Sequence, residues 1–404
     1  MSEQHFVIVG AGLAGAKTAE KLRESGFDGA LTVIGDEQVR PYERPPLTKA
    51  ILLGKSDVDV HVHPADWYAD HDVDLRLGVA AVGLDTAGHM VTLSDGTAVP
   101  FDKLAITTGA HPRRLNAPGA DLPGILYLRT LDDAQRIHAT FDEVQRLVVV
   151  GGGWIGLEVA AAARAAGVAV TVIEAAPLPL VGVLGPQMAA VFAGLHREHG
   201  VDLELGTGVD GFEGEGRVRG VRLADGRVVA GDAVVVGVGI APNTDLAMAG
   251  GLEVDNGILT DEHLRTSHAD VFAAGDVANA FHPVLGRRIR VEHWANALNQ
   301  PTVAAATMLG QEAAYDRLPY FYTDQYDLGM EYVGHASAAN SELVVRGDEQ
   351  AREFIAFWLE GGRVTAGMNV NVWDVVEPIR ELILSGRQVD ASRLADPDVP
   401  LAEV

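Results

Sequence analysis

Short, almost wholly apolar runs recur along the chain, separated by stretches with helical spacing. Runs of this length without polar alternation are typical of strands buried on both faces of a parallel sheet. Two pairs of runs enclose a helical stretch that ends at a glycine, Gly26 in the first copy and Gly167 in the second. The paired runs are residues 6–9 with 31–34 and residues 147–150 with 168–173. The pattern therefore predicts two strand–helix–strand units of a parallel α/β fold.

Further apolar runs place these units in a larger architecture. Buried strands are predicted near residues 104–107, 232–239 and 271–274, and the last of these is expected to return to the first unit. From about Tyr320 the apolar residues predict an antiparallel meander, followed by a helix at 377–385. We therefore expect an α/β protein with two Rossmann-like domains and a C-terminal α+β domain. The expected boundaries are 1–110 with 242–319 for a discontinuous first domain, 111–241 for the second and 320–404 for the third.

Each predicted unit has a glycine-rich turn between its first strand and its helix. The turns are residues 10–15 (GAGLAG) and 151–156 (GGGWIG), and both fit the GxGxxG spacing. Glycines there allow a tight turn and a close approach of the backbone to a pyrophosphate, which the helix N-terminus attracts. Two such turns imply that two dinucleotides bind together, with electrons passing from one to the other. The candidate glycines are Gly10, Gly12, Gly15, Gly151, Gly153 and Gly156.

An acidic residue follows each glycine-rich turn by about 20 residues, after the second strand. These residues are Asp36 and Glu174. A carboxylate at this place accepts hydrogen bonds from the hydroxyls of an adenosine ribose and repels a 2′-phosphate. No Lys or Arg lies in residues 175–180, so NADH is expected at the second unit in preference to NADPH. The alternative interpretation of Glu174 is an exposed acid at a strand end.

Composition removes several classes of function. The 404-residue chain contains no cysteine, which excludes the redox disulfide and the reactive thiol of many two-nucleotide reductases. Its formal net charge of −25 disfavours binding to nucleic acid or to anionic membranes. The densest basic run outside the two units, residues 287–290, is either a partner-binding patch or a solvated loop. No signal peptide or membrane-spanning run is evident, so we expect a soluble cytoplasmic protein; no metal site is predicted.

Six short motifs give the chain a specific family resemblance. They are VIGDE at 33–37, RPYERPPLTK at 40–49, AITTG at 105–109, LYLRT at 126–130, FAAGD at 272–276 and DQY at 324–326. Over essentially its whole length the chain resembles the FAD-containing NADH–ferredoxin reductases of bacterial oxygenase systems. The resemblance implies a glutathione-reductase-like fold without a redox disulfide, with FAD on the first unit and NADH on the second.

The resemblance also implies which residues surround the cofactors. An ion pair between Lys49, beside the flavin, and Glu158, near the nicotinamide, is expected to orient the two rings for hydride transfer. The alternative for Glu158 is an acid that the helix dipole favours in the first turn. Arg44 is expected to offer positive charge to the pyrophosphate or the reduced flavin. The other residues implied at the cofactors, besides the turn glycines and the two acids, are Leu13, Ala14, Ala81, Thr108, Gly109, Arg129, Ile155, Gly239, Gly275, Asp276, Glu292, His293, Trp294 and Tyr322.

The chain departs from the family pattern in two places. Tyr320 and Tyr322 stand where the family usually has tryptophan, and Tyr322 takes the place expected beside the isoalloxazine. Simple core packing is the alternative role for Tyr322 and for Trp294. Residues 177–186 carry no arginine where related chains often do, which is expected to weaken NADH binding or change its on-rate.

The implied activity is electron transfer. NADH reduces FAD, and the flavin then passes single electrons to a two-iron two-sulfur ferredoxin that feeds a haem-thiolate monooxygenase or a ring-hydroxylating dioxygenase. The same flavin chemistry with rubredoxin, a quinone or monodehydroascorbate as acceptor is one alternative. An NADH-sensing flavoprotein that acts through partners is another. A monomer or a weak dimer is expected.

Overall fold

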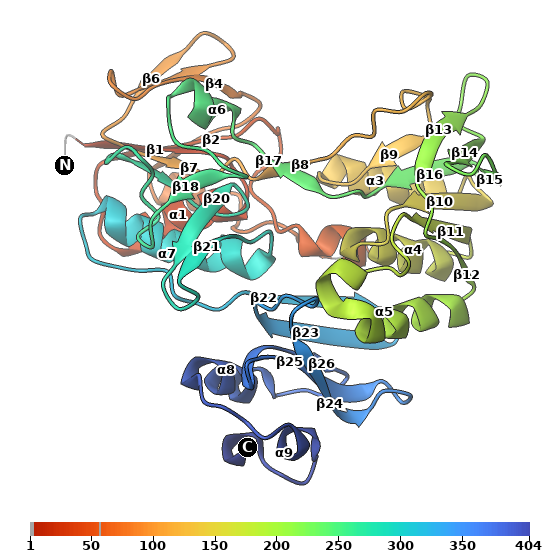
Figure 1. Cartoon of the computed structure of the whole chain (residues 1–404). Helices are drawn as coiled ribbons and strands as arrows, with labels where there is room; N and C mark the ends of the chain where they lie inside the picture. Colours follow the sequence, from red (N-terminus) through yellow and green to blue (C-terminus); the bar gives the residue numbers. More distant parts are fainter. Residues whose placement is uncertain (1–3, 56–57) are drawn as a thin grey trace. The chain divides into compact units, whose positions relative to one another are not determined.

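The computed structural model describes residues 4–55 and 58–404. Its internal contacts divide the chain into two compact units, which are coloured along the sequence in Figure 1. Unit 1 contains Met1–Glu43, Asp59–His111 and Ala241–Pro319, and unit 2 contains Arg44–Val58, Pro112–Ile240 and Tyr320–Val404. The chain therefore passes repeatedly between the units. The division into three domains stays a prediction.

Unit 1 is built on a five-stranded parallel sheet. The strand order is β19 (Val271–Ala273), β7 (Lys103–Ile106), β1 (His5–Val9), β2 (Ala30–Ile34) and β3 (Val73–Arg76). Phe6 and Ile8 of β1 pack in one apolar cluster, with residues of α1 (Leu13–Glu24) and α7 (Trp294–Met308). Val7 and Val9 pack in another, with residues of the small antiparallel sheet. The apolar run at 6–9 thus forms a strand that is buried on both faces, as predicted.

Smaller elements complete unit 1. One antiparallel sheet contains β4 (Ala81–Asp85), β5 (Met90–Leu93) and β6 (Ala98–Pro100), and a mixed sheet contains β18 (Ile258–Thr260), β20 (Ala278–His282) and β21 (Arg287–Arg290). The short helices are α2 (Trp67–Asp70) and α6 (Asp245–Ala249). Strands β8 (Ala110–Pro112) and β17 (Ile240–Pro242) pair with each other where the chain leaves and re-enters the unit.

Unit 2 repeats the parallel sheet. The strand order is β12 (Val201–Leu205), β11 (Ala169–Glu174), β10 (Arg146–Val150), β16 (Ala233–Val236) and β9 (Ile125–Tyr127). Its helices are α3 (Leu131–Phe141), α4 (Trp154–Ala165) and α5 (Val181–Glu198), and a π-helical turn, η1, spans Leu47–Ile51. A three-stranded sheet of β13 (Val209–Glu213), β14 (Gly220–Leu223) and β15 (Val228–Ala230) follows. The second strand–helix–strand unit is therefore β10–α4–β11, as predicted.

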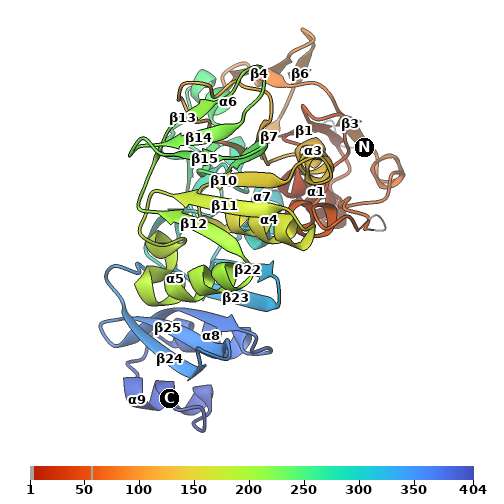
Figure 2. The same ribbon diagram turned by 90° about the vertical axis from the view of Figure 1, so that its right-hand side faces the viewer.

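The C-terminal part of unit 2 is a five-stranded antiparallel sheet. Its order is β22 (Tyr320–Gln325), β23 (Leu328–Gly334), β26 (Arg363–Val370), β25 (Glu353–Glu360) and β24 (Glu342–Asp348). Helices α8 (Val376–Ser385) and α9 (Ala391–Ala395) and a 3₁₀ turn, η2 (Leu401–Glu403), complete the chain. Figure 2 shows α5 lying along this sheet, and Met188 and Phe192 of α5 share an apolar core with Met330 of β23 and Trp358 of β25. The predicted fold class is confirmed.

Candidate functional site

The first glycine-rich turn connects β1 to α1 in unit 1. A Cβ on Gly15 would lie 1.9 Å from the carbonyl oxygen of Gly10, so that only glycine allows the helix to start so close to the strand. A Cβ on Gly12 would meet nothing within 4 Å. Gly12 is also the N-cap of α1, and no side chain caps the helix. The turn therefore leaves open space in front of free backbone N–H groups, which fits a bound pyrophosphate.

The second turn, in unit 2, reproduces this geometry. A Cβ on Gly156 would lie 2.1 Å from the carbonyl oxygen of Gly151, whereas one on Gly153 would meet nothing within 4 Å. Gly153 is the N-cap of α4 and no side chain caps that helix either. Ile155 is exposed beside this N-terminus. Each of the two units thus has a glycine-rich turn that leads into a helix whose N-terminus no side chain caps.

The acidic residues after the two turns differ in position. Glu174 accepts hydrogen bonds from the backbone N–H groups of Gly152, at 2.6 Å, and Ala176, at 2.8 Å, so its carboxylate lies at the rim of the second turn. In the first unit Ile34 pairs with Val9 as Ile173 pairs with Val150, which puts Gly35 where Glu174 stands. Asp36 therefore lies one residue further along and is exposed.

The carboxylate of Glu158 is the centre of a buried cluster in unit 2. The side chain is only 6% exposed and lies 2.9 Å from Nζ of Lys49, as the predicted ion pair requires. The hydroxyl of Thr323 donates to Oε1 at 2.5 Å, and the hydroxyl of Thr48 donates to Oε2. Three donors, two from the π-helical turn and one from strand β22, therefore satisfy a carboxylate that would be costly to bury alone.

The interpretation of Glu158 as a first-turn acid is wrong. Helix α4 begins at Trp154 and has no acidic residue in its first turn. Glu158 lies in the second turn, where the N–H groups are already engaged in the helix and the dipole effect has faded. The helix places Glu158 one helical turn beyond the glycine-rich turn, and its carboxylate contacts Lys49.

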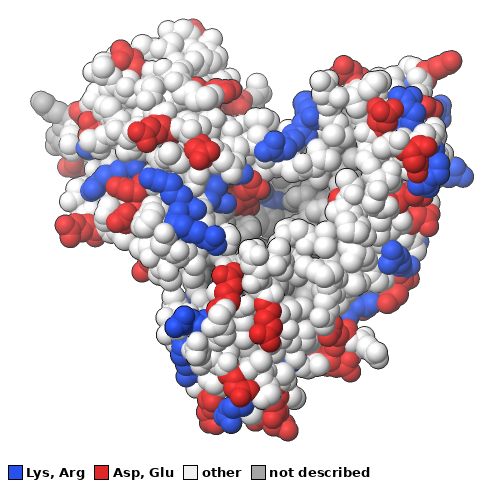
Figure 3. Space-filling model, in the orientation of Figure 1, with Lys and Arg blue, Asp and Glu red and all other residues white. Residues whose placement is uncertain are grey.

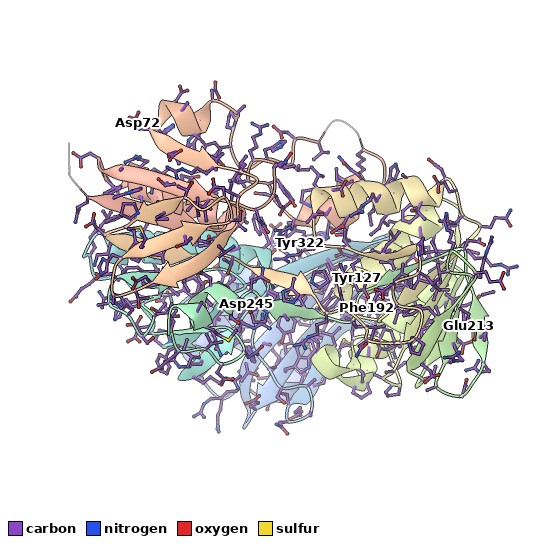
Figure 4. The ribbon with its side chains drawn as sticks, turned by 90° about the horizontal axis from the view of Figure 1, so that it is seen from above. Asp72, Tyr127, Phe192, Glu213, Asp245 and Tyr322 are labelled. Carbon is purple, nitrogen blue, oxygen red and sulfur yellow. The ribbon has the colours of Figure 1, made fainter. Side chains whose placement is uncertain are left out.

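Lys49 contacts an aromatic ring as well as the carboxylate. Its Nζ lies 5.3 Å from the centroid of the Tyr322 ring, within the range of a cation–π contact. Tyr322, labelled in Figure 4, comes from β22, as does Thr323. Burial raises the pKa of the neighbouring Asp324 carboxyl, and the Lys49 ammonium opposes this rise. Lys49 and Thr48 both lie in η1, and such short π-helical turns are frequent at functional sites.

Two further predicted residues meet in unit 2. Arg44 donates a hydrogen bond of 2.5 Å to the carbonyl oxygen of Arg129. Arg129 directly precedes Thr130, which caps α3 in a reciprocal capping box with Asp133. Gly239, also in unit 2, accepts a hydrogen bond from the backbone N–H of Arg113. The structure thus places the Arg44 guanidinium against the backbone of Arg129.

The other predicted residues belong to unit 1. Gly275 is packed close to the first turn, because a Cβ on it would lie 3.0 Å from that of Ala14. The carbonyl of the next residue, Asp276, accepts from Arg290, whose guanidinium is also 2.6 Å from Glu292. The remaining predicted residues lie on other elements of unit 1. His293 and Trp294 are at the start of α7, Leu13 is the first residue of α1, and Ala81 begins β4 and packs against the apolar core. Thr108 and Gly109 follow β7, and the hydroxyl of Thr108 donates to the carbonyl oxygen of Asn243.

Sequence reasoning missed several polar side chains of the Glu158 cluster. Thr48 stands in the sequence only as one member of the RPYERPPLTK motif, and no local pattern distinguishes His196. Gln325, 1% exposed, was noted only within the DQY motif, although it donates to Thr323. The alternation of Phe321, Thr323 and Gln325 along β22 was an available signal, because these three share one face of the strand.

Other candidate features are less distinctive. Figure 3 shows basic side chains gathered over the β20–β21 region of unit 1, where Arg288 donates to the carbonyl of Thr260 and Arg290 pairs with Glu292. Within residues 4–55 and 58–404, no group of three or more His, Asp or Glu side chains is arranged to hold a metal ion. In the same ranges no helix has both the length and the apolar character needed to span a bilayer.

Comparison with known proteins defines the class. Residues 4–301 match the family described as pyridine nucleotide-disulphide oxidoreductase, and residues 320–404 match the family described as reductase C-terminal. The chain belongs to the pyridine nucleotide-disulphide oxidoreductase family. It does so without the cysteines that the family name implies.

Individual relatives narrow this class. The chain is 41% identical to the 5,5′-dehydrodivanillate O-demethylase ferredoxin reductase subunit of a Sphingobium species, covering 99% of this chain and 98% of the relative. It is 38% identical to putidaredoxin reductase of Pseudomonas putida, covering 100% and 97%. Among solved structures it resembles the covalent putidaredoxin reductase–putidaredoxin complex, with a TM-score of 0.95, 38% identity and coverage of 100% and 98%. The chain thus matches reductases of oxygenase systems from end to end.

Proposed function

We propose that the chain is an NADH-dependent ferredoxin reductase that uses FAD. Electrons pass from NADH through the flavin to a small two-iron two-sulfur ferredoxin, which feeds a terminal oxygenase. The observation that carries the proposal is the pair of uncapped glycine turns in a chain with no cysteine. Two dinucleotides fit, and no thiol is present to take electrons from the flavin. The names of the full-length relatives support the same acceptor class.

Residues present in each unit fit the two cofactors. We assign FAD to the open space in front of Gly12 and the N-terminus of α1, with Asp36 on the adenosine ribose and Asp276 on the ribityl chain. We assign NADH to the space in front of Gly153, with the carboxylate of Glu174 on the ribose hydroxyls. The chemistry that the bound cofactors supply is hydride transfer followed by one-electron transfers.

The chain's own residues contribute positioning. The ammonium of Lys49 and the carboxylate of Glu158 hold each other at 2.9 Å, and we assign them to the flavin and nicotinamide rings respectively. Neither group needs to gain or lose a proton, because the hydride transfer that the bound cofactors would supply requires no acid or base from the protein. Their role is to restrict the approach geometry, and a misplacement of about 1 Å can lower such a rate by about a hundredfold.

We place the protein in the cytoplasm, because NADH is produced and reoxidised there. The oligomeric state stays a prediction of a monomer or a weak dimer. The basic residues of β21 stay a candidate partner surface, for a partner with acidic side chains.

The test is an anaerobic titration of the FAD-loaded protein with NADH and, separately, with NADPH. It is followed by stopped-flow mixing of the reduced protein with purified ferredoxins. We expect rapid bleaching of the flavin by NADH, much slower bleaching by NADPH, and rapid reoxidation by at least one two-iron two-sulfur ferredoxin. Bleaching followed by fast reoxidation with rubredoxin or a quinone alone would overturn the assigned acceptor. A stable NADH-reduced complex that no acceptor reoxidises would indicate a sensor.

A further inference from the structure

A continuous chain of buried hydrogen bonds leads away from Oε1 of Glu158, the carboxylate oxygen that also accepts from Lys49. Thr323 donates to Glu158, and the side-chain amide Nε2 of Gln325 lies 3.2 Å from the hydroxyl of Thr323. The amide Oε1 of Gln325 lies 2.8 Å from Nε2 of His196 on α5. Thr323 and Gln325 are each 1% exposed and His196 is 0% exposed. The chain therefore connects α4, β22 and α5 without contact with solvent at these three side chains.

The direction of every hydrogen bond in this chain follows from the charge of Glu158. A carboxylate that is paired with an ammonium can only accept, so Thr323 must direct its single hydroxyl proton at Glu158. The hydroxyl oxygen of Thr323 must then accept from the amide N–H of Gln325. This orientation turns the carbonyl oxygen of Gln325 towards His196, which must therefore carry its proton on Nε2. Each member of the chain has one role as a donor and one as an acceptor.

The far end of the chain agrees with this assignment. With its proton on Nε2, neutral His196 has a free lone pair on Nδ1, and the hydroxyl of Tyr326 lies 3.3 Å from that atom. Burial lowers the pKa of His196 to about 4, which keeps the ring neutral. In the other neutral tautomer Nδ1 of His196 carries the proton, so it cannot accept a hydrogen bond from Tyr326. The donors thus all run from Tyr326 towards Glu158.

Tyr326 occupies a backbone conformation that favours glycine. Gln325 pairs with Leu328, so Tyr326 is the first of two residues in the tight turn between β22 and β23, with φ of +57°. A bulky residue there costs about 1–3 kcal/mol of backbone strain. Its ring is held by stacking on His199, with centroids 3.7 Å apart and an interplanar angle of 11°. A glycine would form the turn without strain, but it would supply no hydroxyl to His196.

We propose that His196, Gln325 and Thr323 form a positioning relay that fixes the orientation of the Glu158 carboxylate, and that His196 acts through the relay in its neutral Nε2–H tautomer. The inference rests on the proposed function, because Glu158 is the residue assigned to the nicotinamide. Lys49 holds Oε1 of Glu158 through a long, flexible side chain, and Thr48 holds Oε2. The Thr323 hydroxyl adds a second donor to Oε1 from strand β22, and the amide of Gln325 prevents the hydroxyl from turning away. His196 in turn prevents the amide from flipping, because a flipped amide would place N–H against N–H.

The first test needs no cofactor. The protein, with its 14 histidines labelled with ¹⁵N, is examined by long-range ¹H–¹⁵N correlation at pH 7, and the His196 signals are assigned by their loss in His196→Gln. We expect a neutral ring with the proton on Nε2. A protonated ring, or a ring with the proton on Nδ1, would overturn the relay. In Gln325→Leu we expect the two nitrogen shifts of His196 to move, because Nε2–H loses its acceptor.

The second test measures hydride transfer directly. Thr323→Val and Gln325→Leu are loaded with FAD and mixed anaerobically with NADH in a stopped-flow spectrometer. We expect the limiting rate of flavin reduction to fall about tenfold in Thr323→Val, since one hydrogen bond to a charged group is lost, and by a smaller factor in Gln325→Leu, where the lost hydrogen bonds join neutral groups. The dissociation constant for NADH is expected to stay within about twofold. Thr323→Ser retains the hydroxyl and is expected to restore the rate.

A matched control separates the relay from general effects of removing a buried hydroxyl. Thr307 of α7 is 3% exposed and its hydroxyl donates to the carbonyl of Val303 in the same helix, so Thr307→Val is expected to leave the rate unchanged. Wild-type rates in both Thr323→Val and Gln325→Leu would refute the relay while leaving the reductase assignment intact. A wild-type flavin that NADH does not reduce would refute the reductase assignment. The tautomer measurement would still test the relay in that case, because it uses neither FAD nor NADH.

Discussion

At the scale of single residues, the Glu158 carboxylate depends on neighbours that lie far away in the sequence. Lys49 comes from a motif 109 positions upstream and Thr323 from a strand 165 positions downstream. The ammonium of Lys49 is the charged partner that offsets the cost of burying this carboxylate, because the two hydroxyl donors are neutral. The charge of Glu158 is therefore stable inside the protein because the charge of Lys49 lies beside it.

Lys49→Met is expected to destabilise the protein by about 3 kcal/mol, because it leaves a buried carboxylate without its counter-ion. Combining it with Glu158→Gln removes the charge and is expected to restore most of the melting temperature. The double variant is not expected to recover the rate of flavin reduction by NADH. Thermal unfolding and anaerobic stopped-flow kinetics measure the two effects. Equal stability of Lys49→Met and wild type would contradict this account.

Glu174 is expected to set the preference for NADH. In Glu174→Gln the negative charge is lost while one amide oxygen still accepts from the backbone of the turn, so kcat/KM for NADH is expected to fall about tenfold. The value for NADPH is expected to rise, because the 2′-phosphate is no longer repelled. Steady-state kinetics with both nucleotides measure the ratio. Asp36→Asn is the control: it lies in the first unit and is expected to leave the ratio unchanged.

At the scale of elements, glycines that look equivalent in each turn have different tasks. Gly15 and Gly156 allow the helix to pass close to the strand, and a side chain there would overlap a backbone carbonyl of the same turn. Gly12 and Gly153 have free space around the missing side chain. Gly15 and Gly156 are therefore required by the fold, whereas Gly12 and Gly153 leave room for a pyrophosphate. Both kinds of glycine recur at the same place in the two strand–turn–helix elements.

Gly156→Ala is therefore expected to lower the melting temperature, because the new Cβ would lie 2.1 Å from the Gly151 carbonyl and the helix must shift. A loss of about 2 kcal/mol or more is expected from such overpacking. Gly153→Ala is expected to leave the melting temperature within about 2 °C of the wild-type value and to weaken NADH binding instead. Thermal unfolding and a fluorescence titration with NADH distinguish the two. The same loss of stability in both variants would refute the division of tasks.

At the scale of the whole molecule, buried groups link stability to pH. The chain has a formal net charge of −25, so acidification first reduces its self-repulsion. His196 instead makes the protein less stable on acidification. Burial lowers its pKa in the folded state to about 4 from an ordinary value of 6.5. Between these two values the unfolded chain binds a proton at this residue and the folded chain does not. Its contribution to stability is therefore complete above pH 6.5 and declines as the pH falls towards 4.

The contribution of His196 to the free energy of unfolding is expected to fall by about 3 kcal/mol across this interval. Denaturant unfolding of wild type and His196→Gln, measured at several pH values between 7 and 4, isolates it, because other groups titrate in both proteins. We expect the stability difference between the two proteins to shrink steadily as the pH falls. A difference that does not change with pH would show that His196 titrates normally in the folded protein.

Local patterns in the sequence determined the fold class and the number of nucleotide sites. Apolar runs such as 6–9 and 147–150 predict buried parallel strands because only a sheet covered on both faces accommodates them. The glycine spacing predicts the turns because the steric requirement is local. The ion pair of Lys49 and Glu158 came from the family resemblance, and the structure contains it. The roles of these residues at bound cofactors stay predictions.

Tertiary structure alone decided how the polar groups are connected. The sequence places Asp36 and Glu174 at similar distances from their turns, yet strand register puts Glu174 at the rim and Gly35 at the equivalent place in the first unit. It also cannot show that His196 meets Gln325, because hydrogen bonds between distant segments follow from the packing of α5 on β22 and not from a local pattern. Burial then determines the tautomer and the charge of each group, since an unpaired polar atom inside the protein is costly.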